Sequence, residues 1–388
     1  MNDKIAAYVD AHRDEIIAMW EDLVNTESGS SMKAGVDAVA NKVKAALEEN
    51  GAEVRVLEHA EAGNGLVAQM PGGDKKPFLF LGHMYTVFNN PGETIRRPFT
   101  IDENGKVTGP GCLDMKGGVV IGIWVGRALK ACGWSDRPIR YILSGDEEVG
   151  HYKSTNAKEI LEESKGCVAC FDCETSYDDN STVSGRKGAI RFQVGITGIA
   201  SHAGNDPKRG RSAILEAAHK VIDLQNLTDW DLGITFNVGN IKGGTVYNAV
   251  PGYCELDVDV RYQDPAHLPM IEKNVQETCA KTYIDGTSTE ILNYMVTCPP
   301  FKETPEGFKL FELLNQTNQE LGYGVLTHKY VGGFSDASYS TLAGVPTMCS
   351  VGVKGGFNHS PEEYCWKESI FERIKLLAAC VMKIDVME

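Results

Sequence analysis

The stretch FLFLGHMYTVF, from Phe78 to Phe88, decides how the core of this 388-residue chain is built. Its first four residues are apolar and predict a buried strand. His83 comes at the carboxyl end of this strand, and Tyr85 follows two residues later. Residues two apart on an extended chain point to the same side, so we expect both rings on one face. This stretch is therefore the first candidate for a functional site.

Further strands lie on both sides of this stretch in the sequence. We expect strands over 64–70, 138–148 and 167–174, and a helix over 118–133. Alternating strands and helices predict an α/β fold, a sheet with helices on both faces. In such sheets functional groups gather at the carboxyl ends of strands. Four residues that can do chemistry lie at such ends: His83, Glu147, Glu148 and Glu174.

A different pattern begins near Lys187. Strand and helix signals occur there in the order β-α-β-β-α-β, which predicts a ferredoxin-like α+β module over 187–298. After residue 298 the alternation of strand and helix signals that marks the first part of the chain returns. The larger domain therefore comprises 1–186 and 299–388, and the small domain is inserted in it. Two domains also suit a chain of this length.

The composition argues against several classes of protein. The net charge of −15 disfavours binding to nucleic acid or to anionic membrane surfaces. No apolar run reaches the roughly 18 residues of a membrane span, and the acidic N-terminus does not resemble a signal peptide. Eleven cysteines show no disulfide framework, so we expect a cytoplasmic protein. A metal site at Cys167, Cys170 and Cys173 is an alternative, although small buried cysteines are common in strands.

Two histidines and several acids stand out in the larger domain. They are His83, Asp114, the pair Glu147–Glu148, the pair Asp172 and Glu174, and His359. Two histidines and three carboxylates suit a two-metal hydrolytic site, and such nitrogen and oxygen ligands suit Zn²⁺. One carboxylate must bridge the two ions, and a further carboxylate must move the proton of the attacking water. The doubled acid Glu147–Glu148 offers one ligand and one base.

The order of the motifs resembles that of the M20 metallopeptidases. LGHM is followed by GPGCLDMKGG, SGDEEVG, FDCET, ITGIASHAG and NHSPEEY, in that order. Each motif alone is weak, but their joint order is specific. The likeness is greatest to the glutamate carboxypeptidase and aminoacylase-like branch and covers about residues 78–364. It implies a zinc-peptidase domain with an inserted dimerisation domain.

The resemblance also implies a role for most members of the metal set. His83 matches a ligand of one zinc, and Asp114 matches the bridging carboxylate. Glu148 and His359 match ligands of the second zinc. Glu147 matches the general base, which takes the proton of the attacking water.

Two acids are candidates for the remaining metal ligand, beside the four ligands just named. Asp172 and Glu174 face the same way if their segment is extended. Glu174, which precedes Thr175, fits the family motif better. The resemblance implies two Zn²⁺ ions per chain, with Co²⁺ or Mn²⁺ as alternatives.

The small domain carries three further matches. His202, in GIASHAG, matches a histidine that in dimeric members reaches the neighbouring subunit's site and polarises the scissile carbonyl; a turn histidine is the alternative. Asn248 and Arg261 match positions that hold a substrate's free carboxylate, since arginine can bind a carboxylate with two donors. A surface salt bridge is the alternative for Arg261. These matches imply a homodimer formed through the inserted domain.

Tyr85 departs from the family pattern. The motif is usually H-x-D-T, and that aspartate orients the metal-bound histidine. A phenol is longer and neutral near pH 7, so three interpretations compete. Tyr85 or a water takes over the role of the aspartate, the metal site is weakened, or the chain is an impaired relative that binds a ligand. Tyr85 therefore counts among the candidate catalytic residues.

Together the matches imply a metal-dependent hydrolase that cleaves an amide bond next to a free carboxylate, as a carboxypeptidase or dipeptidase does. An N-acyl-amino acid amidohydrolase is the alternative within the same chemistry. The substrate would be a small peptide or an N-acyl amino acid. The segment GGFSDA, over 332–337, resembles the family's backbone loop near the substrate.

Overall fold

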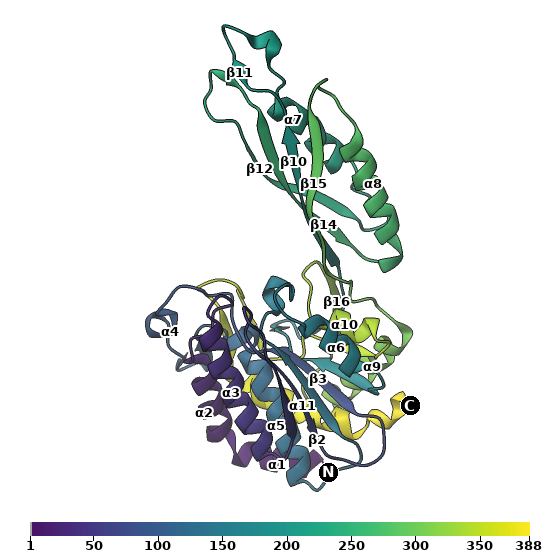
Figure 1. Ribbon diagram of the computed structural model, residues 1–388. Helices are drawn as coiled ribbons and strands as arrows, with labels where there is room; N and C mark the ends of the chain where they lie inside the picture. Colours follow the sequence, from purple (N-terminus) through teal and green to yellow (C-terminus); the bar gives the residue numbers. More distant parts are fainter. Residues whose placement is uncertain (1) are drawn as a thin grey trace. The chain divides into compact units, whose positions relative to one another are not determined.

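The computed structural model describes residues 2–388, which form two compact units. Unit 1 contains the chain up to Gly185, Glu303–Val331 and Ser335–Glu388 (Figure 1). Unit 2 contains Arg186–Lys302 and Gly332–Phe334. The sequence placed the boundaries of the inserted domain at 187 and 298. Among the described residues, no helix is both long enough and apolar enough to span a bilayer.

A mixed sheet of eight strands forms the centre of unit 1. In spatial order the strands are β1 (Glu53–Leu57), β2 (Gly65–Met70), β6 (Ile139–Ser144), β3 (Phe78–His83), β7 (Ala169–Asp172), β17 (Thr347–Cys349), β9 (Ser181–Arg186) and β16 (Thr327–Val331). β3 pairs in parallel with both β6 and β7. The three strands therefore end at the same edge of the sheet, which brings together the residues that follow them.

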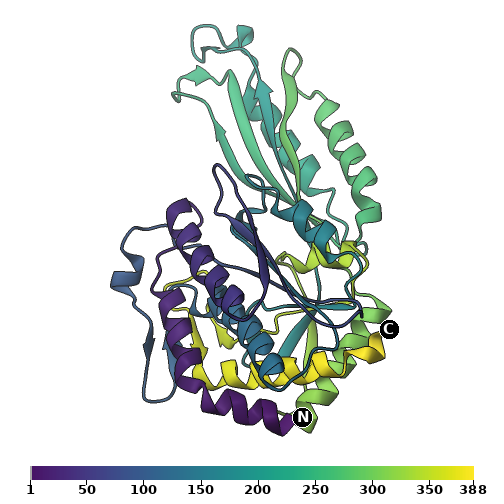
Figure 2. The same cartoon turned by 60° about the horizontal axis from the view of Figure 1, so that its bottom comes forward.

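Helices cover both faces of this sheet, as predicted. One face carries α1 (Asn2–Ala11), α2 (Arg13–Val24), α3 (Lys33–Glu49), α5 (Gly117–Ala131), α9 (Pro305–Glu320) and α11 (Lys367–Met382), and Figure 2 shows α11 in yellow beside α1. Tyr141 of β6 points to this face, where a methyl group on Gly126 of α5 would lie 2.2 Å from its hydroxyl. Arg140 points to the other face and donates to the carbonyl of Glu163 in α6 (Asn156–Ser164). There α6 contacts α10 (Ala337–Leu342).

A second sheet of unit 1 was not predicted. Its five short strands are, in spatial order, β4 (Thr100–Ile101), β5 (Lys106–Thr108), β19 (Tyr364–Trp366), β18 (Lys354–Gly356) and β8 (Ser176–Tyr177), and the short helix α4 (Glu93–Arg96) precedes them. β18 and β19 pair on either side of the loop 357–363, and both contact the turn Cys112–Lys116 before α5. This sheet therefore brings a segment near the end of the chain to the turn that holds Asp114.

Unit 2 is built on a four-stranded antiparallel sheet. The strand order is β12 (Thr235–Gly243), β14 (Tyr253–Tyr262), β10 (Gly188–Thr197) and β15 (Ser288–Cys298). With α7 (Ala213–Gln225) and α8 (Leu268–Ala280), the chain order is β-α-β-β-α-β, which is the predicted ferredoxin-like fold. Residues of β14 alternate between buried and less buried, so the sheet buries one face and leaves the other open. A two-stranded ribbon is formed by β11 (Ser201–His202), which follows β10, and β13 (Ala249–Val250), which precedes β14.

Candidate metal centre

The five candidate metal ligands come from five separate segments of unit 1. His83 is the last residue of β3, Glu148 lies in the turn after β6, and Glu174 follows β7. Asp114 lies in the turn Cys112–Lys116, and His359 lies in the loop between β18 and β19. The parallel strands and the second sheet of unit 1 together gather these side chains at one edge.

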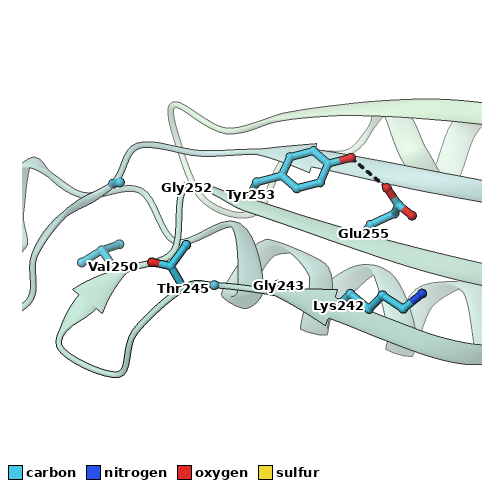
Figure 3. A pocket seen from close by; sticks show the side chains of 9 residues that line it. Lys242, Gly243, Thr245, Val250, Gly252, Tyr253 and Glu255 are labelled. Carbon is cyan, nitrogen blue, oxygen red and sulfur yellow. Dashed lines mark hydrogen bonds between the residues drawn. The ribbon is translucent and has the colours of Figure 1, made fainter.

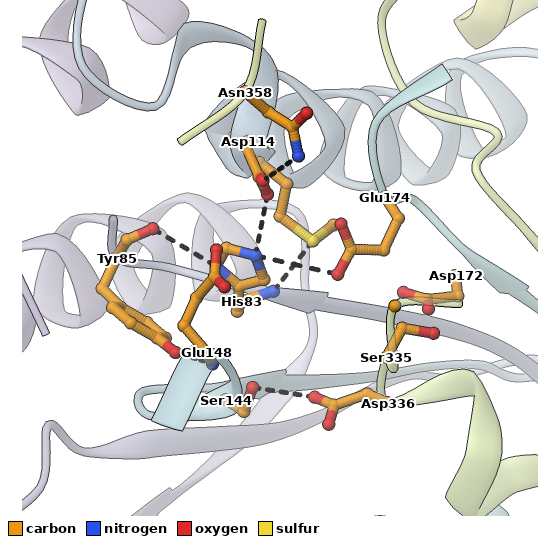
Figure 4. Close-up of polar contacts among 12 residues, drawn as sticks. His83, Tyr85, Asp114, Ser144, Glu148, Asp172, Glu174, Ser335, Asp336 and Asn358 are labelled. Carbon is orange, nitrogen blue, oxygen red and sulfur yellow. Dashed lines mark hydrogen bonds and ion pairs between the residues drawn. The ribbon is translucent and has the colours of Figure 1, made fainter. Parts of the chain in front are cut away.

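Asp114 contacts both histidines, each through a different oxygen atom. Its Oδ1 lies 3.1 Å from His83 Nε2, and its Oδ2 lies 3.1 Å from His359 Nε2. Glu174 Oε1 lies 3.7 Å from His83 Nε2, and Glu148 Oε1 lies 3.0 Å from His359 Nε2. Two donor sets therefore share Asp114, and the ligand atoms of each lie within 4.8 Å of one another. Figure 4 shows the first set, His83, Asp114 and Glu174.

Glu147 forms a third group with His83 and Glu148, within the same 4.8 Å limit. Its side chain is buried. Burial, followed by the charges of Glu148 and Glu174, raises the pKa of Glu147 well above its ordinary value. A carboxyl group with a raised pKa can take up and release a proton near neutral pH, which is what a general base and acid requires.

The charge of the cluster fits divalent cations. Its donors are four carboxylates and only two imidazoles. Burial opposes the change, but the hydrogen bond to Asp114 and the charge of Glu174 raise the pKa of His83 to about 10. Hydrogen bonds to Asp114 and Glu148 raise the pKa of His359 to about 11. A site that draws protons onto both histidines favours positive charge, and its nitrogen and oxygen donors are those that Zn²⁺ binds in proteins.

The two candidates for the remaining ligand lie in different surroundings. Glu174 belongs to the donor set around His83, whereas Asp172 belongs to none of the metal-ligating groups found among residues 2–388. Asp172 Oδ2 instead accepts from the backbone N–H of Ala337 at 3.3 Å and from the thiol of Cys349 at 3.2 Å. The geometry therefore favours Glu174 as the ligand.

The alternative thiolate metal site is not favoured by the structure. Burial raises the pKa of Cys170 and Cys173 well above the ordinary value of a thiol. Metal ligation requires the thiolate, which burial disfavours here. The three cysteines also do not form a metal-ligating group in the described part of the chain.

Tyr85 makes two contacts within the metal centre (Figure 4). The strand ends at His83, so strand geometry does not set the direction of the Tyr85 side chain. His83 Nδ1 lies 3.2 Å from the carbonyl oxygen of Tyr85. A proton on Nδ1 donated to that oxygen leaves Nε2 free to face Asp114. The phenol is fully buried, and its oxygen accepts the backbone N–H of Glu148. The backbone thus does for His83 what the aspartate side chain was expected to do.

Glu363 is a functional candidate that sequence reasoning missed. This buried carboxylate accepts three backbone N–H groups, from Gly111 at 3.1 Å, Leu113 at 2.9 Å and Asp114 at 3.0 Å. It therefore holds the turn that presents Asp114. Its only signal in the sequence is the doubled acid of SPEEY, close after His359.

The loop between β18 and β19 adds two further features. Asn358 Nδ2 donates to Asp114 Oδ2 at 3.1 Å (Figure 4). His359 has φ +64 and a half-exposed side chain. Residues other than glycine adopt this left-handed conformation mainly where surrounding structure holds them, often at functional sites.

His202 and Asn248 lie together on the ribbon of unit 2. His202 pairs with Ala249 across the ribbon, and the N–H of Ala203 donates to the carbonyl of Asn248. His202 Nδ1 accepts from the backbone N–H groups of residues 204 and 205, at 3.1 and 3.0 Å. In this arrangement Nε2 carries the proton of the neutral ring, and the exposed ring can donate it to a hydrogen-bond acceptor. The turn contact and a catalytic role are therefore compatible.

Arg261 lies at the opposite end of β14 from this ribbon. It stands eight positions beyond Tyr253, roughly 27 Å along a strand of ordinary rise. Its Nε and Nη2 donate to the two carboxylate oxygens of Asp259, at 2.8 and 3.1 Å. The structure therefore does not bring Arg261 and Asn248 of one chain to a common binding point, and it pairs Arg261 as the salt-bridge alternative expects.

Unit 2 also contains a hollow of about 510 Å³, shown in Figure 3. Ala200 and Val250 line it beside the ribbon, together with Lys242. Tyr253 and Glu255 also line it, and the Tyr253 hydroxyl donates to Glu255 Oε2 at 3.0 Å. None of the predicted site residues lines this hollow.

Comparison with known proteins places these features in context. Residues 184–287 match a family model described as the peptidase dimerisation domain. The chain is 31% identical over 376 residues to carboxypeptidase G2 from Pseudomonas sp. (strain RS-16), covering 95% of this chain and 89% of that protein. It is 26% identical to succinyl-diaminopimelate desuccinylase from a Nitratiruptor species, covering 77% of this chain and 82% of that protein. The crystal structure of the M20 family metallo-carboxypeptidase Sso-CP2 from Sulfolobus solfataricus has a similar fold, with a TM-score of 0.75 at 15% identity over 96% of this chain and 99% of that one.

Proposed function

We propose a specific reaction for this chain, which belongs to the M20 metallopeptidase family and is a metal-dependent hydrolase of amide bonds. The reaction is cleavage of an amide bond next to a free carboxylate in a small peptide. The observation that carries the proposal is Asp114, whose two oxygens face two separate donor sets. The relatives named as carboxypeptidases support the choice of a substrate with a free carboxylate.

The proposed cofactor is a pair of Zn²⁺ ions, with Co²⁺ or Mn²⁺ as alternatives. His83, Asp114 and Glu174 would hold one ion, and Asp114, Glu148 and His359 would hold the other. Bound there, the ions supply polarisation of the scissile carbonyl and a lowered pKa of the attacking water.

Glu147 is the proposed general base and acid. It takes a proton from the water as the new carbon–oxygen bond forms, and it gives that proton to the amine nitrogen as the carbon–nitrogen bond breaks. The raised pKa of Glu147 supports this role, because the side chain can then hold the proton near neutral pH between the two steps.

The homodimer is proposed to form through the outer edge of unit 2. β12 is an edge strand of the sheet, and the family model matched at 184–287 supports dimerisation through this unit. Exposed apolar side chains lie on α7 and β12, at Ile214, Leu215, Ile222 and Ile241. An unpaired edge strand beside exposed apolar side chains is suited to pairing with a second copy.

His202 is proposed to donate Nε2–H to the substrate carbonyl in the partner's site. Its tautomer supports this role, because the turn N–H groups occupy Nδ1. Asn248, on the same ribbon, would serve the partner's site with it. Arg261 is proposed to bind the substrate carboxylate through Nη1 and the remaining N–H of Nη2, since Asp259 accepts from Nε and from the other N–H of Nη2.

One assay tests the proposed reaction. Protein reconstituted with Zn²⁺ is screened against dipeptides, the same dipeptides with amidated carboxyl termini, and N-acyl amino acids, with metal content measured alongside. We expect turnover of substrates with a free carboxylate and almost none of the amides. Glu147→Gln should keep the zinc but lose turnover by several orders of magnitude. Equal turnover of the free and amidated peptides would contradict the proposal.

The same assay separates the two alternatives. The similarity to a desuccinylase favours an N-acyl-amino acid amidohydrolase as the second candidate, which would prefer acyl amino acids to dipeptides. An impaired relative would bind these compounds without turnover, even with two zinc ions per chain.

The proposed compartment is the cytoplasm. All eleven cysteines are free, and ten of them are buried. A protein with this many unpaired thiols suits a reducing environment.

A further inference from the structure

His151 is a buried histidine of unit 1 that belongs to none of the metal donor sets. It lies on the loop that follows Glu147 and Glu148. Its Nδ1 lies 2.9 Å from Asp146 Oδ1, and its Nε2 lies 2.6 Å from Asp336 Oδ1. Ionised carboxylates only accept hydrogen bonds, so each ring nitrogen must carry a proton. The ring is therefore an imidazolium held between two carboxylates.

The two carboxylates are fixed by further donors. Asn156 Nδ2 donates to Asp146 Oδ1 at 2.7 Å. Ser144, the last residue of β6, donates to Asp336 Oδ2 at 2.8 Å (Figure 4). Burial opposes the change, but the charge of Asp336 and the hydrogen bond to Asp146 raise the pKa of His151 to about 9. The electrostatics therefore agree with the doubly protonated ring that the geometry requires.

The backbone closes the same turn. The N–H of His151 donates to the carbonyl of Asp146 at 3.2 Å, and the N–H of Gly150 donates to the carbonyl of Glu147 at 2.7 Å. His151 has φ +58. This conformation costs free energy for a residue other than glycine, and it persists where surrounding contacts hold it. We call the group Asp146–His151–Asp336 the charged bridge. Two of its members, Asp146 and His151, lie on either side of Glu147 in the sequence.

We propose that His151 is a positioning residue for Glu147. It ties the turn 146–151 to the start of α10 through Asp336, and so fixes the backbone from which the Glu147 carboxylate projects. This inference rests on the proposed role of Glu147 as the base. A reacting group held in place by supporting bonds reacts much faster than one that is free to move by about 1 Å, and the difference can reach about 100-fold.

The variant His151→Asn tests this role. Asparagine tolerates positive φ, so the substitution removes the charged ring without adding strain to the backbone. We expect kcat to fall about 10- to 100-fold while KM and zinc content stay near the wild-type values. The matched control is His59→Asn. His59 Nε2 lies 3.1 Å from Asn156 Oδ1, so it borders the same network without contacting either carboxylate of the bridge. This control should leave kcat unchanged.

Two outcomes would overturn the role: an unchanged kcat in His151→Asn, or a loss of activity that follows lost zinc or lost fold. A second measurement does not depend on activity. In protein labelled with ¹⁵N-histidine, His151 should show two ring N–H protons near neutral pH, and both signals should vanish in His151→Asn. A single ring N–H on His151 would show that the ring is not doubly protonated and would contradict the charged bridge, whichever substrate the enzyme hydrolyses. Absence of turnover in the wild type, with both signals present, would instead reject the proposed reaction.

Discussion

At the scale of single residues, Tyr85 divides two tasks between its backbone and its side chain. The carbonyl oxygen accepts from His83 Nδ1, and the phenol oxygen accepts from the Glu148 N–H. Any residue at position 85 supplies the carbonyl, whereas only a long side chain with an acceptor reaches Glu148. The absence of the family aspartate therefore does not by itself leave His83 without a partner.

Tyr85→Phe separates these two tasks. The phenylalanine keeps the ring and the carbonyl but leaves the Glu148 N–H without its acceptor, which costs about 1–3 kcal/mol in a buried site. We expect weaker zinc binding at the donor set that contains Glu148, and kcat/KM lower by about 10- to 100-fold. Chelator competition and steady-state kinetics measure both effects. Tyr141→Phe, at a buried tyrosine of β6, is the control, and equal behaviour of the two variants would refute the assignment.

Glu363 acts on a ligand that both donor sets share. Glu363→Gln keeps the size of the side chain but replaces one acceptor oxygen with an NH2 group, so that at least one of the three backbone N–H groups loses its acceptor. Because Asp114 is the displaced ligand, we expect the affinity for both zinc ions to fall together, by about 10- to 100-fold. Glu362→Gln, at the exposed neighbouring residue, should bind zinc as the wild type does. Loss of only one ion in Glu363→Gln would show that the turn is not held in this way.

At the scale of elements, the sequence predicted those parts of the fold that have a clear period. Continuous apolar runs indicated β3 and α5, and alternation along the chain indicated the sheet of unit 2. The second sheet of unit 1 was missed because its strands have only two or three residues, too few to show a period. The N-terminal segment is divided near His12 into α1 and α2, because the φ of −112 and ψ of 21 at His12 are not helical.

The candidate site shows the same limit. Each metal-ligating residue sits in a short motif of its own, so the motifs could be read along the chain. The hydrogen bond between His151 and Asp336 joins residues 185 positions apart, and that between Glu363 and Gly111 joins residues 252 apart. A short motif cannot indicate such pairs, because only the folded backbone brings the two residues together.

The turn 146–151 should make stability depend on pH. The pKa of His151 is raised from 6.5 to about 9, so the folded chain holds this proton more tightly than the unfolded chain. The contribution is complete below the unfolded pKa and is lost as pH rises toward the folded value, by roughly 3 kcal/mol at most. Urea unfolding of the wild type and His151→Asn should show a difference in stability that narrows over this range. A difference that stays constant or widens with rising pH would contradict the charged bridge.

At the scale of the whole molecule, the inserted domain is proposed to complete the site of a second copy. Subunits with His202→Ala and subunits with Glu147→Ala should each be inactive alone. If His202 acts across the interface, random mixing should restore about a quarter of the wild-type activity, since half of the dimers then contain one intact site. Unfolding and refolding the two variants together, followed by a kinetic assay, gives the measurement. No recovery, with dimers confirmed by light scattering, would place His202 in its own subunit's site or outside the mechanism.

The insertion also constrains the order in which the chain folds as it leaves the ribosome. Unit 2 is almost continuous in sequence, and the N–H of Arg186 donates to the carbonyl of Phe301, so its entry and exit strands meet. Unit 1 instead needs β17, β16 and α11 from the last third of the chain to complete its sheet and cover α5. Domains fold as units during synthesis, and contacts distant in sequence form late. A nascent chain that ends near Lys302 therefore carries nearly all of unit 2 and an open unit 1, whose apolar sheet face must be shielded until translation ends.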